Sequence, residues 1–115
     1  MSGLTTHILD LTAGRPAVAV AIRLFARRDG AWAETITVQT DADGRARLLP
    51  GDAFTAGAYR LEFDVGPYFR ASGAAAADPG FLETVVIDFH VADADQHHHV
   101  PLLVSPFGYS TYRGS

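Results

Sequence analysis

Apolar and polar residues alternate at every second position along much of this chain. The pattern is clearest from Tyr59 to Val65, where four apolar side chains alternate with Arg60, Glu62 and Asp64. Successive side chains of a β-strand point to opposite faces, so this alternation predicts a strand with one face in the core and one in water.

The same pattern recurs between short groups of turn-forming residues such as Asp29-Gly30. Pro67 and Gly73 stand near the start and end of a segment that predicts one short helix over residues 66–73. Strands are predicted over residues 4–10, 17–28, 32–40, 45–49, 59–65, 82–91, 97–104 and 107–112. Seven to eight short strands with one short helix indicate an all-β fold, a two-sheet antiparallel sandwich.

Two of these strands carry specific expectations about their faces. The strand over 17–28 is expected to place five apolar residues on its core face: Val18, Val20, Ile22, Leu24 and Ala26. The strand over 32–40 is expected to share one face among Trp32, Glu34, Ile36 and Val38. Both assignments assume unbroken alternation.

Composition narrows the class of protein. With 115 residues, 48% apolar and 19% charged, the chain fits one globular domain over residues 1–115. The formal charge of −4 is spread out, and no basic cluster exceeds Arg27-Arg28, which argues against a nucleic-acid partner. No cysteine is present, so disulfides and thiolate chemistry are excluded.

The first ten residues contain neither a basic segment nor a long apolar run. They therefore give no indication of a signal peptide or of a membrane span. The expected compartment is the cytoplasm.

The last twenty residues combine a histidine run, an aliphatic strand and an aromatic, charged end. Val100, Leu102 and Val104 are expected on the core face. The opposite face carries His97, His99, Pro101 and Leu103. Two imidazoles beside apolar side chains suit a cleft or a subunit contact better than open water.

Taken residue by residue, these candidates have ordinary explanations. An isolated His7 on a strand is more often structural than functional, and Arg45 after the Gly44 turn would be a solvated charge. His97 and His99, two positions apart, could supply half of a zinc site. The four C-terminal residues would be a frayed end.

Four segments together resemble a known family. They are Thr6–Asp10 with Gly14–Ala17 after it, Thr40–Arg45, His97–Leu103, and the closing Tyr112–Ser115. Across its length the chain resembles the transthyretin-related proteins. The closing Tyr-Arg-Gly-Ser resembles the branch that hydrolyses 5-hydroxyisourate rather than the hormone-carrying transthyretins.

The resemblance implies a transthyretin-like sandwich that assembles into a homotetramer, a dimer of dimers with active clefts where the dimers meet. It implies ring opening of 5-hydroxyisourate to 2-oxo-4-hydroxy-4-carboxy-5-ureidoimidazoline in urate degradation, without a metal or an organic cofactor. His7, Arg45 and His99 match the catalytic positions. His7, Arg45, Tyr112, Arg113, Gly114 and Ser115 match the substrate-binding positions, with His97 in a supporting position.

The chain departs from the family at His98, where tyrosine is usual. By strand period His98 faces the core, so the departure is expected to affect packing more than chemistry.

Hydrolysis of a cyclic amide needs a base for water, a charge partner for the oxyanion and a proton for the leaving nitrogen. One of His7 and His99 is expected to activate water while the other positions or protonates the substrate, and Arg45 would bind the ring oxygens. The sequence leaves open which histidine is the base. The competing class is a carrier that binds a small aromatic ligand in the same fold without turning it over.

Overall fold

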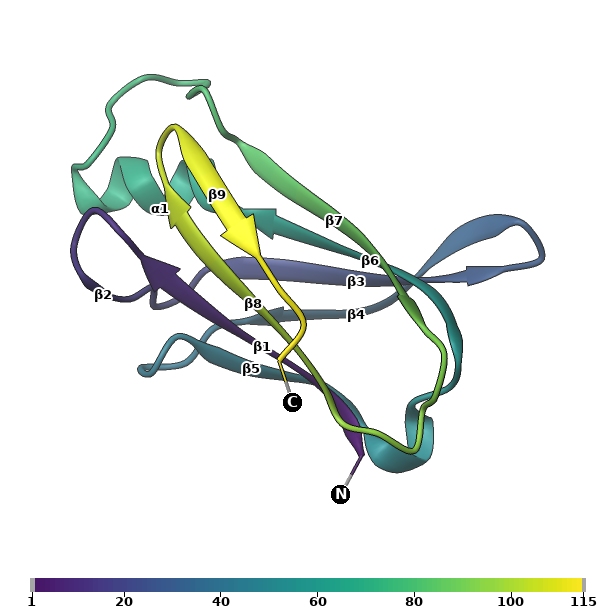
Figure 1. Cartoon of the computed structure of the whole chain (residues 1–115). Helices are drawn as coiled ribbons and strands as arrows, with labels where there is room; N and C mark the ends of the chain where they lie inside the picture. Colours follow the sequence, from purple (N-terminus) through teal and green to yellow (C-terminus); the bar gives the residue numbers. More distant parts are fainter. Residues whose placement is uncertain (1, 115) are drawn as a thin grey trace.

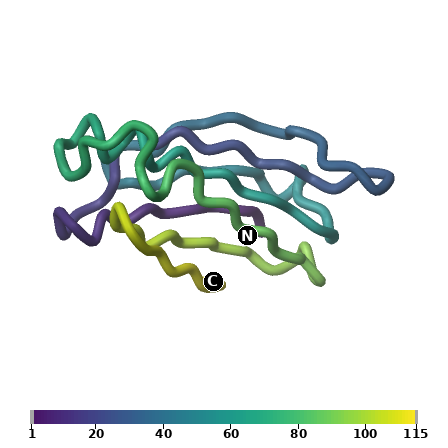
Figure 2. Tube along the Cα trace, turned by 90° about the horizontal axis from the view of Figure 1, so that it is seen from above, coloured from purple at the N-terminus to yellow at the C-terminus, as the bar shows by residue number. Residues whose placement is uncertain are grey.

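Two β-sheets pack face to face in the computed structural model, which describes residues 2–114 (Figures 1 and 2). One sheet has the strand order β4 (Ala31–Gln39), β3 (Ala21–Arg28), β6 (Gly57–Asp64), β7 (Thr84–Val91). The other has the order β2 (Arg15–Pro16), β1 (Gly3–Asp10), β8 (His98–Ser105), β9 (Gly108–Thr111), with β5 (Arg45–Pro50) also paired to β1. A 3₁₀ turn, η1 (Gly51–Ala53), and the helix α1 (Val65–Ser72) complete the elements.

The predicted two-sheet sandwich with one short α-helix is confirmed, with one difference in strand direction. All pairs are antiparallel except β1 and β8, which run parallel with Thr5 opposite His99. The difference arises because β8 takes the place beside the first strand, so the two ends of the chain lie in one sheet.

The core lies between the two sheets. Leu4, Ile8, Leu61, Phe63 and Leu102 are completely inaccessible to solvent. These residues occupy alternate positions of β1, β6 and β8, so the alternation identified the buried face of these strands correctly.

The expected strand over residues 17–28 begins later, at Ala21. Ala19 has a φ of 61°, which interrupts the extended backbone, and Val18 is 47% exposed instead of facing the core. Val20 is buried as expected, although it precedes the first residue of the strand. Its backbone N–H donates to Thr40 Oγ1 at 2.9 Å.

The prediction that Trp32, Glu34, Ile36 and Val38 share one face of their strand is wrong. Leu24 pairs with Ile36 and Phe25 pairs with Glu34, so Thr35 has no partner and forms a β-bulge. A bulge adds one residue to one strand, which exchanges the faces on either side of it. Consequently the half of β4 that contains Ile36 and Val38 packs toward the core.

The helix predicted over 66–73 is confirmed with a shift of one residue. Gly73 ends it in the left-handed conformation, with φ 81°, and donates its backbone N–H to the last turn. In the described part of the chain, no helix is long and apolar enough to span a membrane. The cytoplasmic location stays a prediction.

Candidate functional site

The outward face of three neighbouring strands brings the predicted catalytic residues together. In the β1–β5 pair His7 lies opposite Arg45, and two positions earlier Thr5 lies opposite Arg47. On the other side of β1, Thr5 lies opposite His99 of β8. Residues two apart share a strand face, so all five side chains belong to one surface.

The tight turn before β5 fixes where Arg45 enters the sheet. Asp41 Oδ1 accepts the backbone N–H groups of Asp43 and Arg45 at 2.9 and 3.0 Å. Gly44 has a φ of 74°, and a Cβ there would lie 2.6 Å from the carbonyl oxygen of Ile8. Only glycine fits this close approach, so the turn holds Arg45 beside His7.

His7 and His99 face each other with their ring centroids 6.5 Å apart. The Nε2 of His7 lies 2.9 Å from the backbone oxygen of Asp43. A carbonyl oxygen only accepts hydrogen bonds, so His7 Nε2 carries a proton and donates it. In the neutral ring the lone pair is then on Nδ1, which has no hydrogen-bond partner among the described residues.

Thr5 lies between the two histidines of β8. Its Oγ1 is 3.0 Å from His97 Nε2 and 2.8 Å from His99 Nδ1. The Nε2 of His99 has no hydrogen-bond partner within residues 2–114. His99 therefore keeps its second ring nitrogen available for a ligand or a water molecule.

The charges around His99 act on its protonation. Burial lowers the pKa of His99 below its usual 6.5, and the positive groups of His7, Arg45 and His97 lower it further. His99 is consequently neutral at neutral pH, which is the form that can accept a proton.

A cleft of about 360 Å³ opens on this surface. Its lining includes Thr5, Arg45, Arg47, His97 and His99. None of the ion pairs between described residues involves either arginine. The cleft therefore offers positive charge and imidazole nitrogens to an anionic or oxygen-rich ligand.

Gly114 lies directly against His99. Its backbone N–H donates to the carbonyl oxygen of His99 at 2.6 Å, and its own oxygen accepts from the His99 N–H at 3.3 Å. A Cβ at Gly114 would lie 3.0 Å from Cδ2 of the imidazole, so any larger residue would push the ring. Ser115, the last predicted binding residue, lies outside the described residues.

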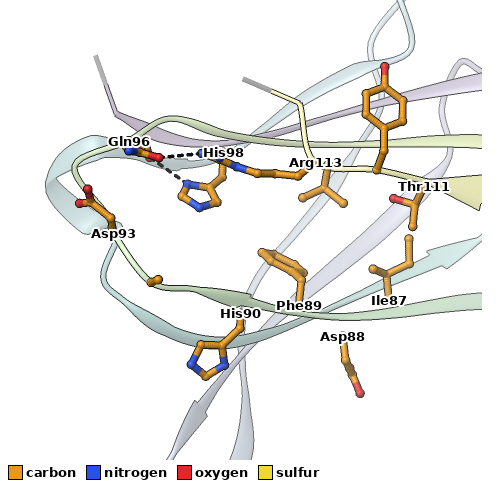
Figure 3. A pocket seen from close by; sticks show the side chains of 12 residues that line it. Ile87, Asp88, Phe89, His90, Asp93, Gln96, His98, Thr111 and Arg113 are labelled. Atoms are coloured by element: carbon orange, nitrogen blue, oxygen red, sulfur yellow. Dashed lines mark hydrogen bonds between the residues drawn. The ribbon is translucent and has the colours of Figure 1, made fainter.

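Tyr112 and Arg113 line a different and larger cavity, of about 630 Å³, between β7 and the strands β8 and β9 (Figure 3). Arg113 donates from Nη2 to Gln96 Oε1 and to the His97 carbonyl oxygen, both at 3.2 Å. Within a single chain these two residues are thus not among those that line the cleft of Arg45 and His99. Their substrate-binding role stays a prediction.

His98 packs inward, as its place in the strand period predicts. It is 7% exposed, it donates from Nδ1 to the Gln96 carbonyl oxygen at 2.9 Å, and its ring meets the Phe54 ring edge-on at 5.4 Å. His98 also lines the larger cavity with Tyr112 and Arg113, so the expectation that its departure affects packing more than chemistry stays a prediction.

Thr5 and Arg47, which line the cleft, were not predicted from the sequence. The signal was available, because Thr5 stands two positions before His7 and Arg47 two positions after Arg45 on the same faces. For the zinc alternative, residues 2–114 contain no group of three histidine, aspartate or glutamate side chains placed to hold a metal ion. Independence from a metal stays a prediction.

The similarity of this chain to known sequences extends over nearly its whole length. Residues 4–114 match the sequence model of the HIUase/Transthyretin family. The chain is 60% identical over 116 aligned residues to the 5-hydroxyisourate hydrolase of Caulobacter vibrioides, covering 100% of both chains.

Solved structures give the same grouping. The chain matches Klebsiella pneumoniae 5-hydroxyisourate hydrolase with a TM-score of 0.81 and 36% identity, covering 100% of both chains. It matches sea bream transthyretin in complex with thyroxine with a TM-score of 0.86 and 34% identity, covering 96% of this chain and 93% of that one. It also matches (S)-allantoin synthase with a TM-score of 0.90 and 38% identity, where 99% of this chain spans only 44% of the larger protein.

Proposed function

The chain belongs to the HIUase/Transthyretin family, and from this membership we propose that it hydrolyses 5-hydroxyisourate in urate degradation. The observation that supports this most strongly is the single surface on which His7, Arg45 and His99 meet, in a chain 60% identical to a hydrolase of that name. The product is 2-oxo-4-hydroxy-4-carboxy-5-ureidoimidazoline, formed when a cyclic amide C–N bond is cleaved by water.

Arg45 binds the substrate and stabilises negative charge. Its guanidinium has no carboxylate partner among the described side chains, so its donors are available to the oxygens of the purine-derived ring. As water attacks the ring carbonyl, the oxyanion that forms is held by this fixed positive charge.

His99 is the general base. It is neutral because its pKa is lowered, and its Nε2 is available to take a proton from water. The water oxygen bonds to the carbonyl carbon, the C–N bond breaks, and the leaving nitrogen receives a proton, which His7 supplies from Nδ1 when its ring carries a proton on both nitrogens. Bulk water then restores both histidines.

The active assembly is a homotetramer, a dimer of dimers. Tyr112 is 61% exposed in the single chain, and β7 and β9 are edge strands whose outer sides have no partner within residues 2–114. Exposed edges are suited to pairing with a second copy. Assembly would bring Tyr112 and Arg113 to the substrate, beside Gly114, which already lies against His99 in the single chain. Light scattering that gives the mass of one chain at working concentration would contradict the assembly.

One experiment separates the enzyme from a carrier. Urate and urate oxidase generate 5-hydroxyisourate, and its absorbance is followed with and without catalytic amounts of the protein. A hydrolase accelerates the decay over many turnovers. A carrier, such as the transthyretin solved in complex with thyroxine, binds at most one ligand per site. In catalytic amounts it would therefore leave the decay rate unchanged.

A further inference from the structure

The hydroxyl of Thr5 contacts one ring nitrogen of each β8 histidine, and this double contact has a chemical consequence. Oγ1 lies 3.0 Å from His97 Nε2 and 2.8 Å from His99 Nδ1. A threonine hydroxyl has one proton to donate, and it accepts through its lone pairs. It therefore donates to one imidazole and accepts from the other.

The two arrangements give His99 opposite properties. When Thr5 donates to His99 Nδ1, the neutral His99 ring carries its proton on Nε2 and presents a donor to the cleft. When His99 Nδ1 donates to Thr5, the lone pair is on Nε2 and His99 presents a base. In the second arrangement the Thr5 proton points to His97 Nε2, so the state of His97 is tied to that of His99.

We propose that the Thr5 hydroxyl is a proton relay that passes the proton taken by His99 from water on to His97. This inference deepens the proposed function, on which it rests. It makes Thr5 a positioning residue, since it acts through the two imidazoles rather than on the substrate.

The transfer balances in protons. His99 Nε2 takes a proton from water, which leaves both nitrogens of that ring protonated. Nδ1 then gives its proton to Thr5 Oγ1 while the hydroxyl proton moves to His97 Nε2. His99 ends neutral with its proton on Nε2, the threonine hydroxyl is restored, and the positive charge is on His97.

The surroundings of His99 favour this displacement of charge. The ring centroid of His7 on β1 lies 6.5 Å from that of His99, and Arg45 of β5 lines the same cleft as His99. Among residues 2–114, Asp41 supplies the one carboxylate that lines the cleft, and it already accepts two backbone N–H groups. Within residues 2–114 a positive charge on His99 is therefore poorly compensated, which favours its departure from that ring. His97, which receives it, lines the same cleft as Arg45 and Arg47, and Arg113 donates to its carbonyl oxygen at 3.2 Å.

Two variants of Thr5 separate the hydroxyl from the shape of the side chain. Thr5→Val keeps the branched shape suited to a strand and removes the hydroxyl, whereas Thr5→Ser keeps the hydroxyl. Imidazole ¹⁵N chemical shifts report which ring nitrogen carries the proton. They are recorded on the ligand-free protein in steps of about one pH unit, from roughly pH 5 to 9. We expect Thr5→Val to change the tautomer populations of both His97 and His99, and Thr5→Ser to keep the native pattern. Native shifts in Thr5→Val would overturn the relay, whatever the activity of the protein.

Kinetics provide the second readout. For Thr5→Val we expect kcat to fall by about tenfold, with KM unchanged because Thr5 does not bind the ring, and the pH dependence of kcat to shift. Thr5→Ser should restore most of the rate. His97→Gln should cause a similar loss, and the double variant should lose no more than either single variant. Additive losses, or a native kcat and pH profile in Thr5→Val, would contradict the proposal.

Absence of hydrolysis by the native protein would instead defeat the proposed function, and the ¹⁵N shifts would still decide the relay.

Discussion

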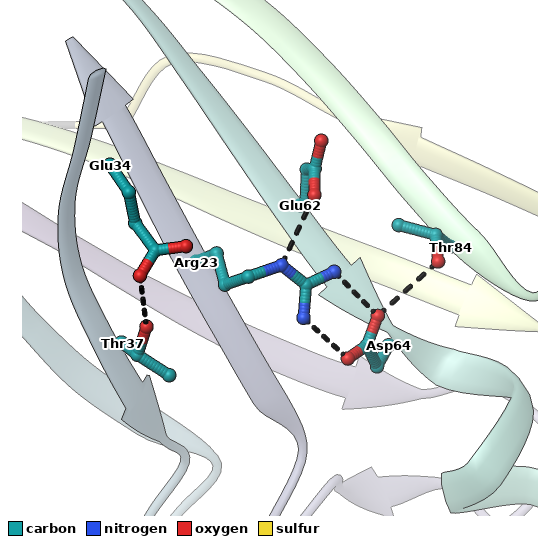
Figure 4. A network of polar contacts seen from close by, with 6 residues as sticks. All are labelled: Arg23, Glu34, Thr37, Glu62, Asp64 and Thr84. Atoms are coloured by element: carbon teal, nitrogen blue, oxygen red, sulfur yellow. Dashed lines mark hydrogen bonds and ion pairs between the residues drawn. The ribbon is translucent and has the colours of Figure 1, made fainter. Parts of the chain in front are cut away.

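The two sheets carry two polar surfaces that use charge in opposite ways. On the outer face of β3 and β6, Arg23 donates to Glu62 at 3.1 Å and to both oxygens of Asp64 at 2.7 and 2.9 Å (Figure 4). Thr84 of β7 donates to the same Asp64 carboxylate at 3.2 Å. Every strong donor of this group has its acceptor within the chain, and Arg23 holds the pKa of Asp64 below its usual value.

The outer face of β1, β5 and β8 has cations without such partners. Arg45 and Arg47 take part in none of the ion pairs between described residues; His97 and His99 line the same cleft, and His7 lies opposite Arg45. The pairing of charges, not their number, therefore separates a structural network from a binding site. Unpaired cations destabilise a fold, and a site that binds an anionic or oxygen-rich ligand accounts for them.

The largest expected effect comes from removing an imidazole from the unpaired surface. His99→Ala should lower turnover of freshly generated 5-hydroxyisourate by about 10² to 10⁴, because the general base is lost. His90→Ala is the control for the cleft of Arg45 and His99: His90 is an exposed histidine on β7 that lines the other cavity and not this cleft. Equal activity of the two variants would place the base elsewhere.

The same arginine-to-lysine change should act differently on the two surfaces. Arg45→Lys should lower kcat/KM by about 10- to 100-fold, because lysine cannot make the two-pronged contact, and should leave the unfolding free energy near that of the native protein. Arg23→Lys should leave kcat/KM unchanged and cost about 1 to 2 kcal/mol in urea unfolding. If Arg23→Lys impaired catalysis as much as Arg45→Lys, the distinction between the surfaces would fail.

Acid should affect activity before it affects the paired network. Because the pKa of His99 is lowered, it becomes protonated only below its usual 6.5, and kcat/KM should then fall by about tenfold per pH unit. The fold opposes this protonation, so His99 also removes some stability as the pH drops below 6.5. Asp64 has a lowered pKa, so the stability it provides is present above its usual value of 3.8 and is lost as the pH falls through the folded value.

Rate profiles and urea unfolding over the same pH range test this order. Loss of activity with a midpoint above 6.5, or a collapse of the ion-pair network at the same pH as the activity, would contradict it.

The smallest expected effect is at Arg47. Arg47→Gln should raise KM by about two- to fivefold and reduce its salt dependence, because an exposed cation contributes weak long-range attraction. Arg28→Gln, an exposed arginine at the end of β3, is the matched control and should change neither. Identical salt dependence in both variants would remove Arg47 from the site.

Much of the fold followed from local pattern. Strands with regular alternation, such as β6, and turns with a required glycine, such as the one at Gly44, were predicted because their signals lie within a few residues. The bulge at Thr35 and the break at Ala19 were not predicted. Both depend on pairing across strands, and neither residue type carries a local sequence signal for such an irregularity.

The site was predictable in part. His7, Arg45 and His99 were identified by resemblance, and the structure places them on one surface. The contact of Thr5 with His97 and His99 depends on the parallel register of β1 and β8, which no local pattern encodes. The places of Tyr112 and Arg113 in the other cavity depend on how the end of the chain folds back, which is equally non-local.

The parallel pairing of β1 with β8 determines when the protein can become active during its synthesis. Thr5 and His99 are 94 positions apart, so the residues between them must be synthesised before the two can meet. At about 5–20 residues per second, roughly 5 to 20 s pass between the synthesis of Thr5 and that of His99. During this time the side of β1 that pairs with β8 is an exposed strand edge, which chaperones can protect. A nascent chain that lacks β8 can therefore acquire much of its secondary structure and remain inert, and catalysis begins only once β8 has been added beside β1.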